Sequence, residues 1–301
     1  MIRRKFLLLG VLSTIALCAS AAADEKLLFE KQSKFNHIYV TENEKGLRTL
    51  WFEEYGHQQT VVKPGDPDYI ELDYAKVMPV GFTVVEEPKR VLIVGLGGGT
   101  LPTFFRKHYP QMKIDVVDID PDVVDVAKKY FGFREDDNMK AYAQDGRKFI
   151  EEAKEPYDLI FLDAFSADSI PYDLVTREFL QAVRKAAGPK GVVVANLWER
   201  KVNPLYDSMV RTYQEVFEDV YVIDVKHDSG NLILMAAPRK LDLKKDDLVQ
   251  RAKKIVKEKK YPMNLDEFIA DGYQHEVEKN AKGIILLDKD KNKKPEEKKA
   301  A

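Results

Sequence analysis

The stretch RVLIVGLGGGTLPTFFRKHYPQMKIDVVDID, residues 90–120, decides the architecture. It joins two apolar runs, residues 90–94 and 113–118, through a glycine-rich turn and a segment with the composition of a helix. Continuous apolar strands that alternate with helices are typical of a parallel sheet covered on both faces. Because the glycines stand between strand and helix, the backbone there can approach a ligand at the helix N-terminus.

Five further apolar runs repeat this pattern on the C-terminal side of residues 90–120. They predict an α/β fold over residues 88–240, with a Rossmann-like, seven-stranded sheet of the methyltransferase type. The last two runs are joined by residues 227–230, which indicates a terminal antiparallel pair. The five runs read MKAYAQ, YDLIFLDAF, GVVVANLW, DVYVIDV and NLILMAA.

The residues before this domain favour a small antiparallel sheet. In residues 24–87, apolar and polar residues alternate over 35–40 and 47–52, with a turn between them, and a linking helix is expected over 69–80. After the domain, residues 241–285 predict a helical extension. The final residues, 286–301, are charged and nearly free of apolar side chains, which predicts disorder.

The N-terminus has the three parts of a secretory signal peptide, predicted as residues 1–23. A basic start at residues 3–5 precedes an apolar run at residues 6–17, and Ala21-Ala22-Ala23 supplies a cleavage signal. The mature chain would begin near Asp24 and be secreted or periplasmic, with no membrane attachment after cleavage. The alternative is an uncleaved anchor, although the apolar run is shorter than the ~20 residues that a spanning helix needs.

Composition narrows the classes of partner. The formal net charge is −2 and both signs are interleaved, so nothing indicates a nucleic-acid surface. The single cysteine, Cys18, lies in the predicted signal peptide, which excludes disulfides from the mature chain. The five histidines lack the spacing of metal ligands, so no metal is expected. A small-molecule site is the remaining expectation.

Acidic residues follow three of the predicted strands. Asp118 and Asp120 come about 20 residues after the glycines, where a carboxylate can accept both ribose hydroxyls. Asp118 is the candidate, because Asp120 precedes a proline and is suited to cap the next helix. Asp145 can accept from an adenine amino group, with helix capping as its alternative role. Together with Gly95, Gly97 and Gly99, these acids predict a nucleoside site.

Asp163, at the end of YDLIFLDAF, is the candidate for catalysis. Ligands of open parallel sheets bind at the carboxyl ends of strands, so this carboxylate would face the reacting centre. An amine has an ordinary pKa near ~10 and must lose a proton before it can attack. Asp163 could bind the ammonium and take that proton. Asp168 and Asp173 are weaker candidates on the loop that follows.

Several segments resemble the spermidine/spermine synthase family of polyamine aminopropyltransferases, over residues 30–237. They are SKFNHIYV, QQT at Gln58–Thr60, and LDYAKVM, which is similar to the helix that bears the family's active-site tyrosine. The resemblance implies transfer of an aminopropyl group from decarboxylated S-adenosylmethionine to a polyamine-type amine, without a metal. Family enzymes are usually dimers or tetramers, so a homodimer is one expected assembly.

The resemblance also assigns roles to residues. It implies that Asn36 and Gln58 contact the nucleoside or its sulfonium side, and that Asp118 and Asp145 hold the ribose and the adenine. It makes Asp163 the catalytic acid/base. The implied substrate-binding residues are Tyr74, Asp168 and His227.

Four positions depart from the family pattern and keep alternatives open. Gly98 replaces the aspartate that holds the amine of the aminopropyl group, and Ser166 replaces a second aspartate. Ala75 replaces a glutamine, and His227 replaces a late tyrosine that helps to bind the polyamine. The loop GLGGGTLP also resembles related methyltransferase-like proteins, so intact S-adenosylmethionine is an alternative donor and methyl transfer an alternative reaction. A secreted protein that binds the nucleoside or a polyamine without turnover is the third hypothesis.

Overall fold

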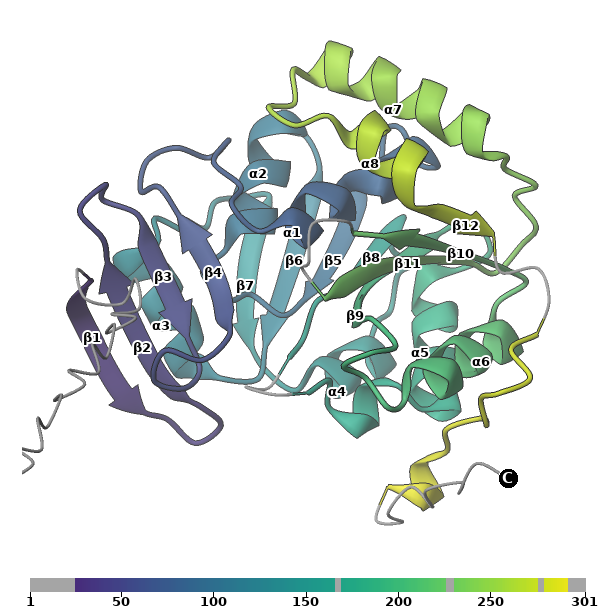
Figure 1. Cartoon of the computed structure of the whole chain (residues 1–301), viewed down its shortest axis with the longest axis horizontal. Coiled ribbons are helices and arrows are strands. Elements are labelled where there is room, and N and C mark those ends of the chain that lie inside the picture. The colour runs from purple at the N-terminus through teal and green to yellow at the C-terminus, as the bar shows by residue number, and fades with distance from the viewer. Residues whose placement is uncertain (1–24, 166–168, 226–229, 276–278, 292–301) are drawn as a thin grey trace, which may run out of the picture.

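The computed structural model describes residues 25–165, 169–225, 230–275 and 279–291. Its larger sheet contains all seven of the strands predicted from the apolar runs, and their order confirms the Rossmann-like fold class (Figure 1). The strands run in the order β12-β10-β11-β9-β8-β5-β6-β7. Their bounds are β5 Arg90–Val94, β6 Lys113–Asp118, β7 Met139–Ala143, β8 Leu159–Leu162, β9 Val192–Trp198, β10 Asp219–Asp224, β11 Asn231–Ala237 and β12 Tyr273–His275.

The order in which successive strands are added to the sheet reverses at β5. It runs from β5 to β6 and β7 on one side, then crosses to β8 and β9 on the other, and these strands are all parallel. Such a switch opens a crevice at the carboxyl ends of the two central strands, where ligands of α/β proteins bind. The glycine-rich turn follows β5 and Asp163 follows β8, so both lie at this switch.

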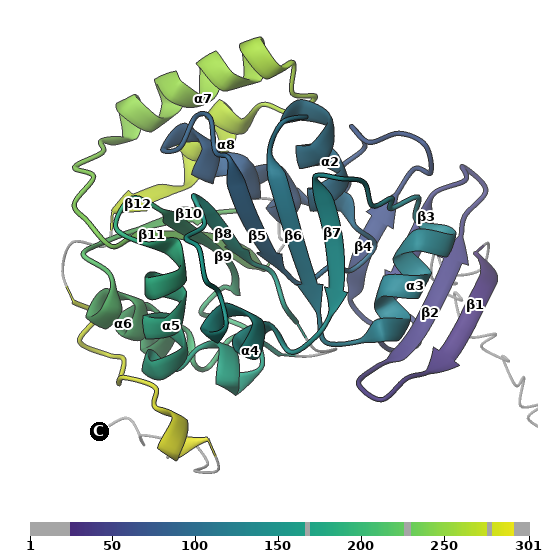
Figure 2. The same ribbon diagram turned by 180° about the vertical axis from the view of Figure 1, so that it is seen from behind.

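Helices cover both faces of the large sheet (Figures 1 and 2). One apolar cluster packs the sheet against η2, α2, α7 and α8, and a second packs it against α4, α5 and α6. The bounds are α1 Asp73–Val77, η2 Met78–Thr83, α2 Thr100–His108, α3 Pro121–Tyr130, α4 Gly146–Glu151, η3 Tyr172–Leu174, α5 Arg177–Ala187, α6 Tyr206–Val216, α7 Lys245–Lys259, α8 Leu265–Gly272 and η4 Asp288–Asp290.

The N-terminal residues form a separate four-stranded antiparallel sheet, as Figure 1 shows at its left. The predicted hairpin is present, and further strands extend it on both sides. One face of this sheet packs against α3 through apolar side chains such as Val40, Leu50 and Val126. Its strands are β1 Lys26–Gln32, β2 His37–Glu42, β3 Arg48–Trp51 and β4 Gln58–Val62.

Three boundaries differ from the prediction. The linking helix is shorter and continues as the 3-10 turn η2, because Pro79 follows its first turns. The helical extension also supplies β12, a three-residue strand paired with β10 that is too short to show a periodic pattern. The predicted disordered tail begins later than expected, because residues 286–291 are docked on α5 and α6; residues 292–301 lie outside the described part.

Asp120 joins the two sheets. It is fully buried, and its Oδ1 accepts from the backbone N–H of Asp122, 3.0 Å away, which confirms its predicted role as the cap of α3. Its Oδ2 accepts from the Ser33 hydroxyl at 2.5 Å and from the Asn36 amide at 3.3 Å. One carboxylate therefore starts a helix and fixes the N-terminal sheet against it.

Replacing Asp120 with alanine should lower the free energy of unfolding by about 2–3 kcal/mol, because it removes a helix cap and leaves buried donors without an acceptor. The exposed Asp137→Ala variant is the control and should change stability by less than about 0.5 kcal/mol. Urea unfolding measures both. A loss below about 0.5 kcal/mol for Asp120→Ala would contradict this role.

Candidate active site

The glycine-rich turn after β5 is in contact with the end of β8. Gly95 has a φ of +102°, and a Cβ atom there would lie 2.1 Å from the Asp163 carbonyl oxygen. Any side chain would therefore collide with the β8 backbone, whose Asp163 N–H donates to Val94 O at 2.8 Å. Glycine is required at this position so that the turn and the Asp163 backbone can lie side by side.

Asp118, at the end of β6, holds the same turn in place. Its Oδ2 accepts from the backbone N–H of Leu96 at 2.9 Å, and its Oδ1 from that of Asp120 at 3.0 Å. Burial is the main cause that raises the pKa of this carboxyl, partly offset by these hydrogen bonds. Asp118 thus orders the turn in addition to any contact it makes with a ligand.

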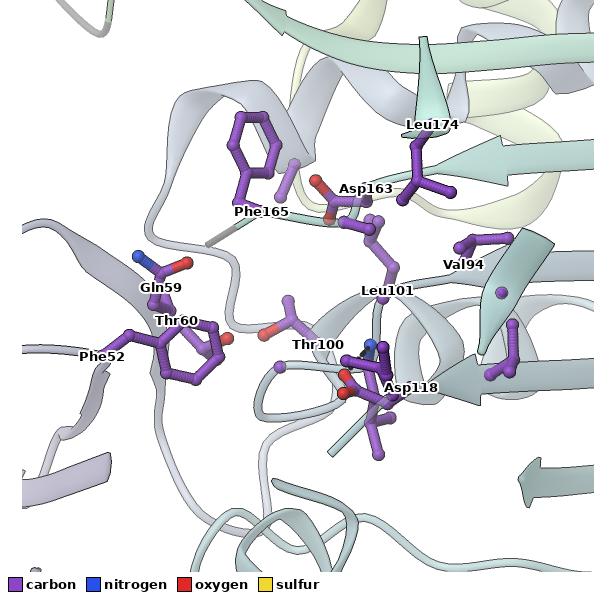
Figure 3. Close-up of a pocket in the computed structure, with 18 of the residues that line it drawn as sticks. Phe52, Gln59, Thr60, Val94, Thr100, Leu101, Asp118, Asp163, Phe165 and Leu174 are labelled. Carbon is purple, nitrogen blue, oxygen red and sulfur yellow. Dashed lines mark hydrogen bonds between the residues drawn. The ribbon is translucent and has the colours of Figure 1, made fainter. Parts of the chain in front are cut away.

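A pocket lies between the carboxyl ends of β5, β6 and β8 and the N-terminal sheet (Figure 3). We call it the central pocket. Gln59, Thr60 and Phe52 enter it from the N-terminal sheet, and Asp118 and Asp163 face it from the large sheet (Figure 3). The other lining residues used below are Asn36, Leu72, Tyr74, Gly95, Gly97, Asp145, Arg147, Phe165, Pro171, Asp173 and Leu174.

Asp163 has a partly buried carboxyl with two side-chain donors. The Asn196 amide donates to its Oδ1 at 2.9 Å, and the Tyr74 hydroxyl donates to the same carboxyl group. Burial raises the pKa of Asp163 to about 7, against the lowering effect of these two hydrogen bonds. A carboxyl with this pKa can hold or release a proton near neutral pH, as a general base requires.

A second pocket, the side pocket, adjoins the central one beside Asp163. It is lined by Trp198, Phe165 and Asn196 among others, and the two pockets share Gln59, Leu72, Tyr74 and Phe165. The Phe165 and Trp198 rings stack with centroids 5.5 Å apart. The side pocket therefore offers an aromatic-walled route toward the Asp163 carboxyl.

The structure brings most of the predicted site residues together. Eight of them line the central pocket, namely Asn36, Tyr74, Gly95, Gly97, Asp118, Asp145, Asp163 and the weaker candidate Asp173. Gly99 is the N-cap of α2 and lines a different pocket, and Gln58 lines the side pocket but not the central one. Asp168, His227 and Ser166 lie outside the described residues. The ligand roles of all these residues stay predictions.

Two of these residues also have structural partners. Asp145 accepts from the Lys148 N–H at 3.0 Å and so caps α4, the alternative considered for it, while still lining the pocket. The Asn36 amide donates to Asp120, which holds the side chain at the pocket edge. Their positions in the pocket are therefore fixed by the fold itself.

The sequence pattern missed Gln59, Arg147 and Asn196. Gln59 reaches the pocket because the β3–β4 pairing shifts there: Leu50 pairs with Thr60, but Trp51 pairs with Gln58. Such a bulge changes which side chain faces the ligand. Asn196 could have been noticed as a polar residue inside the apolar run GVVVANLW, since buried polar side chains need partners.

Gly98, the main departure from the family pattern, is closely packed. A Cβ atom there would lie 2.6 Å from Thr60 Cγ2 and 2.9 Å from the Phe131 ring. Its N–H also donates to the Thr60 hydroxyl at 2.9 Å. Thr60 and Phe131 therefore occupy the space into which a side chain at this position would first project.

The described residues contain neither a cluster of metal-ligating side chains nor a helix suited to span a membrane. No three histidine, cysteine, aspartate or glutamate side chains in residues 25–291, outside the gaps, are grouped as metal ligands would be. No helix in the same part of the chain has the length and apolar composition needed to cross a membrane.

Fold and pocket define a Rossmann-like α/β protein of the methyltransferase type with a second, N-terminal sheet over its ligand crevice. The spermine/spermidine synthase domain model matches residues 74–224, and this chain belongs to that family. The polyamine aminopropyltransferase of Vibrio vulnificus (strain CMCP6) is 32% identical over 235 residues, which cover 76% of this chain and 78% of the relative.

Two solved structures are similar over most of their length. A spermidine synthase in complex with the transition state analogue AdoDATO is 25% identical with a TM-score of 0.66, covering 82% of this chain and 85% of that one. Human methyltransferase-like protein 13 in complex with SAH is 31% identical with a TM-score of 0.57, covering 64% of this chain and 94% of that one. The family thus indicates a transferase.

The raised pKa of Asp163 predicts a pH-dependent effect of Asp163→Asn on stability. Between pH 4 and pH 7 the unfolded chain releases this proton while the folded chain keeps it, so the wild type loses stability as pH rises through about 7. Asparagine does not titrate, so the variant does not have this loss of stability with rising pH. The melting temperature of the variant relative to wild type should therefore increase from pH 5 to pH 8, by calorimetry. A difference independent of pH would contradict the assignment.

Proposed function

We propose that this protein transfers the aminopropyl group of decarboxylated S-adenosylmethionine to an amine, with Asp163 as the general base. The observation that carries the proposal is the Asp163 carboxyl, which is partly buried, has a pKa of about 7 and lines the central pocket. Its two hydrogen-bond donors, Tyr74 and Asn196, both line the side pocket. Family membership and the similarity to a spermidine synthase bound to AdoDATO support the choice of donor.

The proposed reaction is a substitution at carbon. An ammonium acceptor near Asp163 gives its proton to the carboxylate, and the freed nitrogen lone pair attacks the carbon next to the sulfonium. The carbon–sulfur bond breaks, its electrons return to sulfur, and methylthioadenosine leaves. Asp163 then releases the proton to solvent. Because an amine has a pKa near ~10, this proton transfer is the step that needs a base.

Each of the two pockets would take one substrate. Asp118 and Asp145 would hold the ribose and adenine in the central pocket, while the amine would enter through the side pocket. Phe165, Trp198 and Tyr74 give that route aromatic walls, which attract cations. The bound sulfonium would also lower the Asp163 pKa, since an opposite charge nearby favours the carboxylate. The donor would thus activate the base only once it is bound.

Methyl transfer from intact S-adenosylmethionine is the second candidate, and the packing at Gly98 favours it. At this position the family has a carboxylate that holds the aminopropyl ammonium. This chain has a glycine there, and Thr60 and Phe131 fill the space that the side chain would take. The similarity to methyltransferase-like protein 13 bound to SAH points in the same direction. Donor choice therefore needs a direct measurement.

The cellular setting stays a proposal as well. Residues 1–23, the predicted signal peptide, lie outside the described part of the chain, and export of the mature protein is proposed from sequence alone. A homodimer is proposed from the family. N-terminal sequencing of the native protein and light scattering of the purified chain measure these two properties.

Asp163→Asn should reduce turnover by at least about 100-fold, because asparagine cannot take the amine proton. Product formation from each donor with a panel of amines is followed by mass spectrometry. The control is Asp158→Asn at the opposite end of β8, where an amide oxygen can still accept from the Lys89 and Arg90 N–H groups. Full activity of Asp163→Asn would exclude it as the base, whereas donor binding without any product would support a non-catalytic binding protein.

Donor preference should change in the double variant Thr60→Ser/Gly98→Asp. Serine keeps the hydroxyl that accepts from the residue-98 N–H and removes the Cγ2 atom 2.6 Å from the new Cβ. The Phe131 ring, 2.9 Å away, must still shift, and the new carboxylate would then hold the aminopropyl ammonium. The ratio of kcat/KM for the decarboxylated donor to that for the intact donor should rise about tenfold. Thr60→Ser alone is the control. An unchanged ratio would contradict the assigned role of position 98.

A further inference from the structure

The described C-terminal residues, 279–291, form a segment that we call the C-terminal strap. It descends along α6 in Figures 1 and 2 and ends beyond it. The Asn280 amide donates to Asp207 at 2.8 Å, and the Leu286 N–H donates to the Thr212 hydroxyl at 3.0 Å. Leu286 is only 3% exposed and belongs to the apolar core under α5 and α6. The strap is thus firmly docked.

The end of the strap holds Arg147, which lines the central pocket. The Arg147 Nη1 and Nη2 atoms donate to the two carboxylate oxygens of Asp288 at 2.8 and 2.6 Å. The Thr176 hydroxyl donates to Asp288 Oδ1 at 2.6 Å. Arg147 is the main cause that lowers the pKa of the Asp288 carboxyl. Paired bonds of this kind fix a guanidinium in one plane.

The same strap also holds the pocket rim formed by residues 171–174. The Tyr172 hydroxyl donates to the Leu287 carbonyl at 3.2 Å, and Lys291 forms an ion pair with Asp173. Pro171, Asp173 and Leu174 line the central pocket next to Arg147. Two separate parts of one pocket wall are therefore supported from behind by a segment that does not itself line the pocket.

Arg147 directly follows Gly146 in the first turn of α4, whose cap is the adenine candidate Asp145. Its Nε donates to Glu151 at 2.9 Å, so protein groups hold this side chain from two sides. Without Asp288, the long arginine side chain would regain rotamer freedom, and the wall beside Asp145 would have to be ordered again when a ligand binds.

We propose that Asp288 is a positioning residue of the nucleoside site: through Arg147 and the 171–174 rim, the C-terminal strap pre-forms the wall at the adenine end of the central pocket. This inference rests on the proposed nucleoside binding. It assigns a function in binding to a segment at the C-terminus, more than 100 residues from the pocket residues it supports.

The test is calorimetric titration of the full chain with methylthioadenosine. Asp288→Ala should weaken binding about tenfold, and Arg147→Lys, which keeps the charge but loses the paired bonds, should weaken it in the same direction. The control is Lys289→Ala, an exposed residue on the same turn, which should bind within twofold of wild type. With saturating donor, kcat and the KM for the amine should be unchanged in Asp288→Ala.

Each outcome decides a separate point. Unchanged affinity in Asp288→Ala, with wild type binding well, would overturn the strap inference and leave the proposed function intact. If the wild-type chain does not bind methylthioadenosine, the proposed function is overturned. Equal weakening in Lys289→Ala, or a fall in kcat at saturating donor, would show a general structural effect and would also overturn the positioning role. If Asp288→Ala does not fold, Asp288→Asn gives the test, because it keeps the size of the side chain and removes the charge that pairs with Arg147.

Discussion

The close approach of the β5 and β8 backbones at Gly95 is the constraint on which the rest of the site depends. There is no room for a Cβ atom between Gly95 and the Asp163 carbonyl, so the glycine turn and the proposed base are held side by side by main-chain geometry. Asp118 then fixes the turn through the Leu96 N–H. The proposed nucleoside-binding groups and the proposed base thus have a fixed spacing before any ligand arrives, which is the pre-organisation that catalysis requires.

The supports around this centre come from distant parts of the chain. Asp120 attaches the N-terminal sheet, which brings Gln59 and Thr60 over the crevice, and Asp288 supports the opposite wall through Arg147. Asn196 and Tyr74 hold the Asp163 carboxyl in a partly buried position where its pKa is about 7. The free energy lost by burying this carboxyl is the physical origin of its proposed reactivity, because the same burial that destabilises its charged form makes it a better base.

Residues that end a strand could be placed from sequence, because an apolar run fixes where its last side chain emerges. Asp118, Asp145 and Asp163 were found in this way, and all three line the central pocket. Gln59 could not be found, since a bulge in β4 changes which glutamine faces inward. The docked strap was predicted to be disordered from residue 286 onward, because its charges look solvated until the partners Arg147 and Thr176 are known, and no local pattern records a contact over such a separation.

A crystal structure of the chain with methylthioadenosine tests the central claim most directly, because it locates every atom of the proposed product at once. The account predicts the ribose hydroxyls on Asp118, the adenine amino group at Asp145, and the thioether sulfur turned toward Asp163 and the side pocket. A nucleoside bound elsewhere, or bound in the central pocket with its sulfur turned away from Asp163, would contradict it.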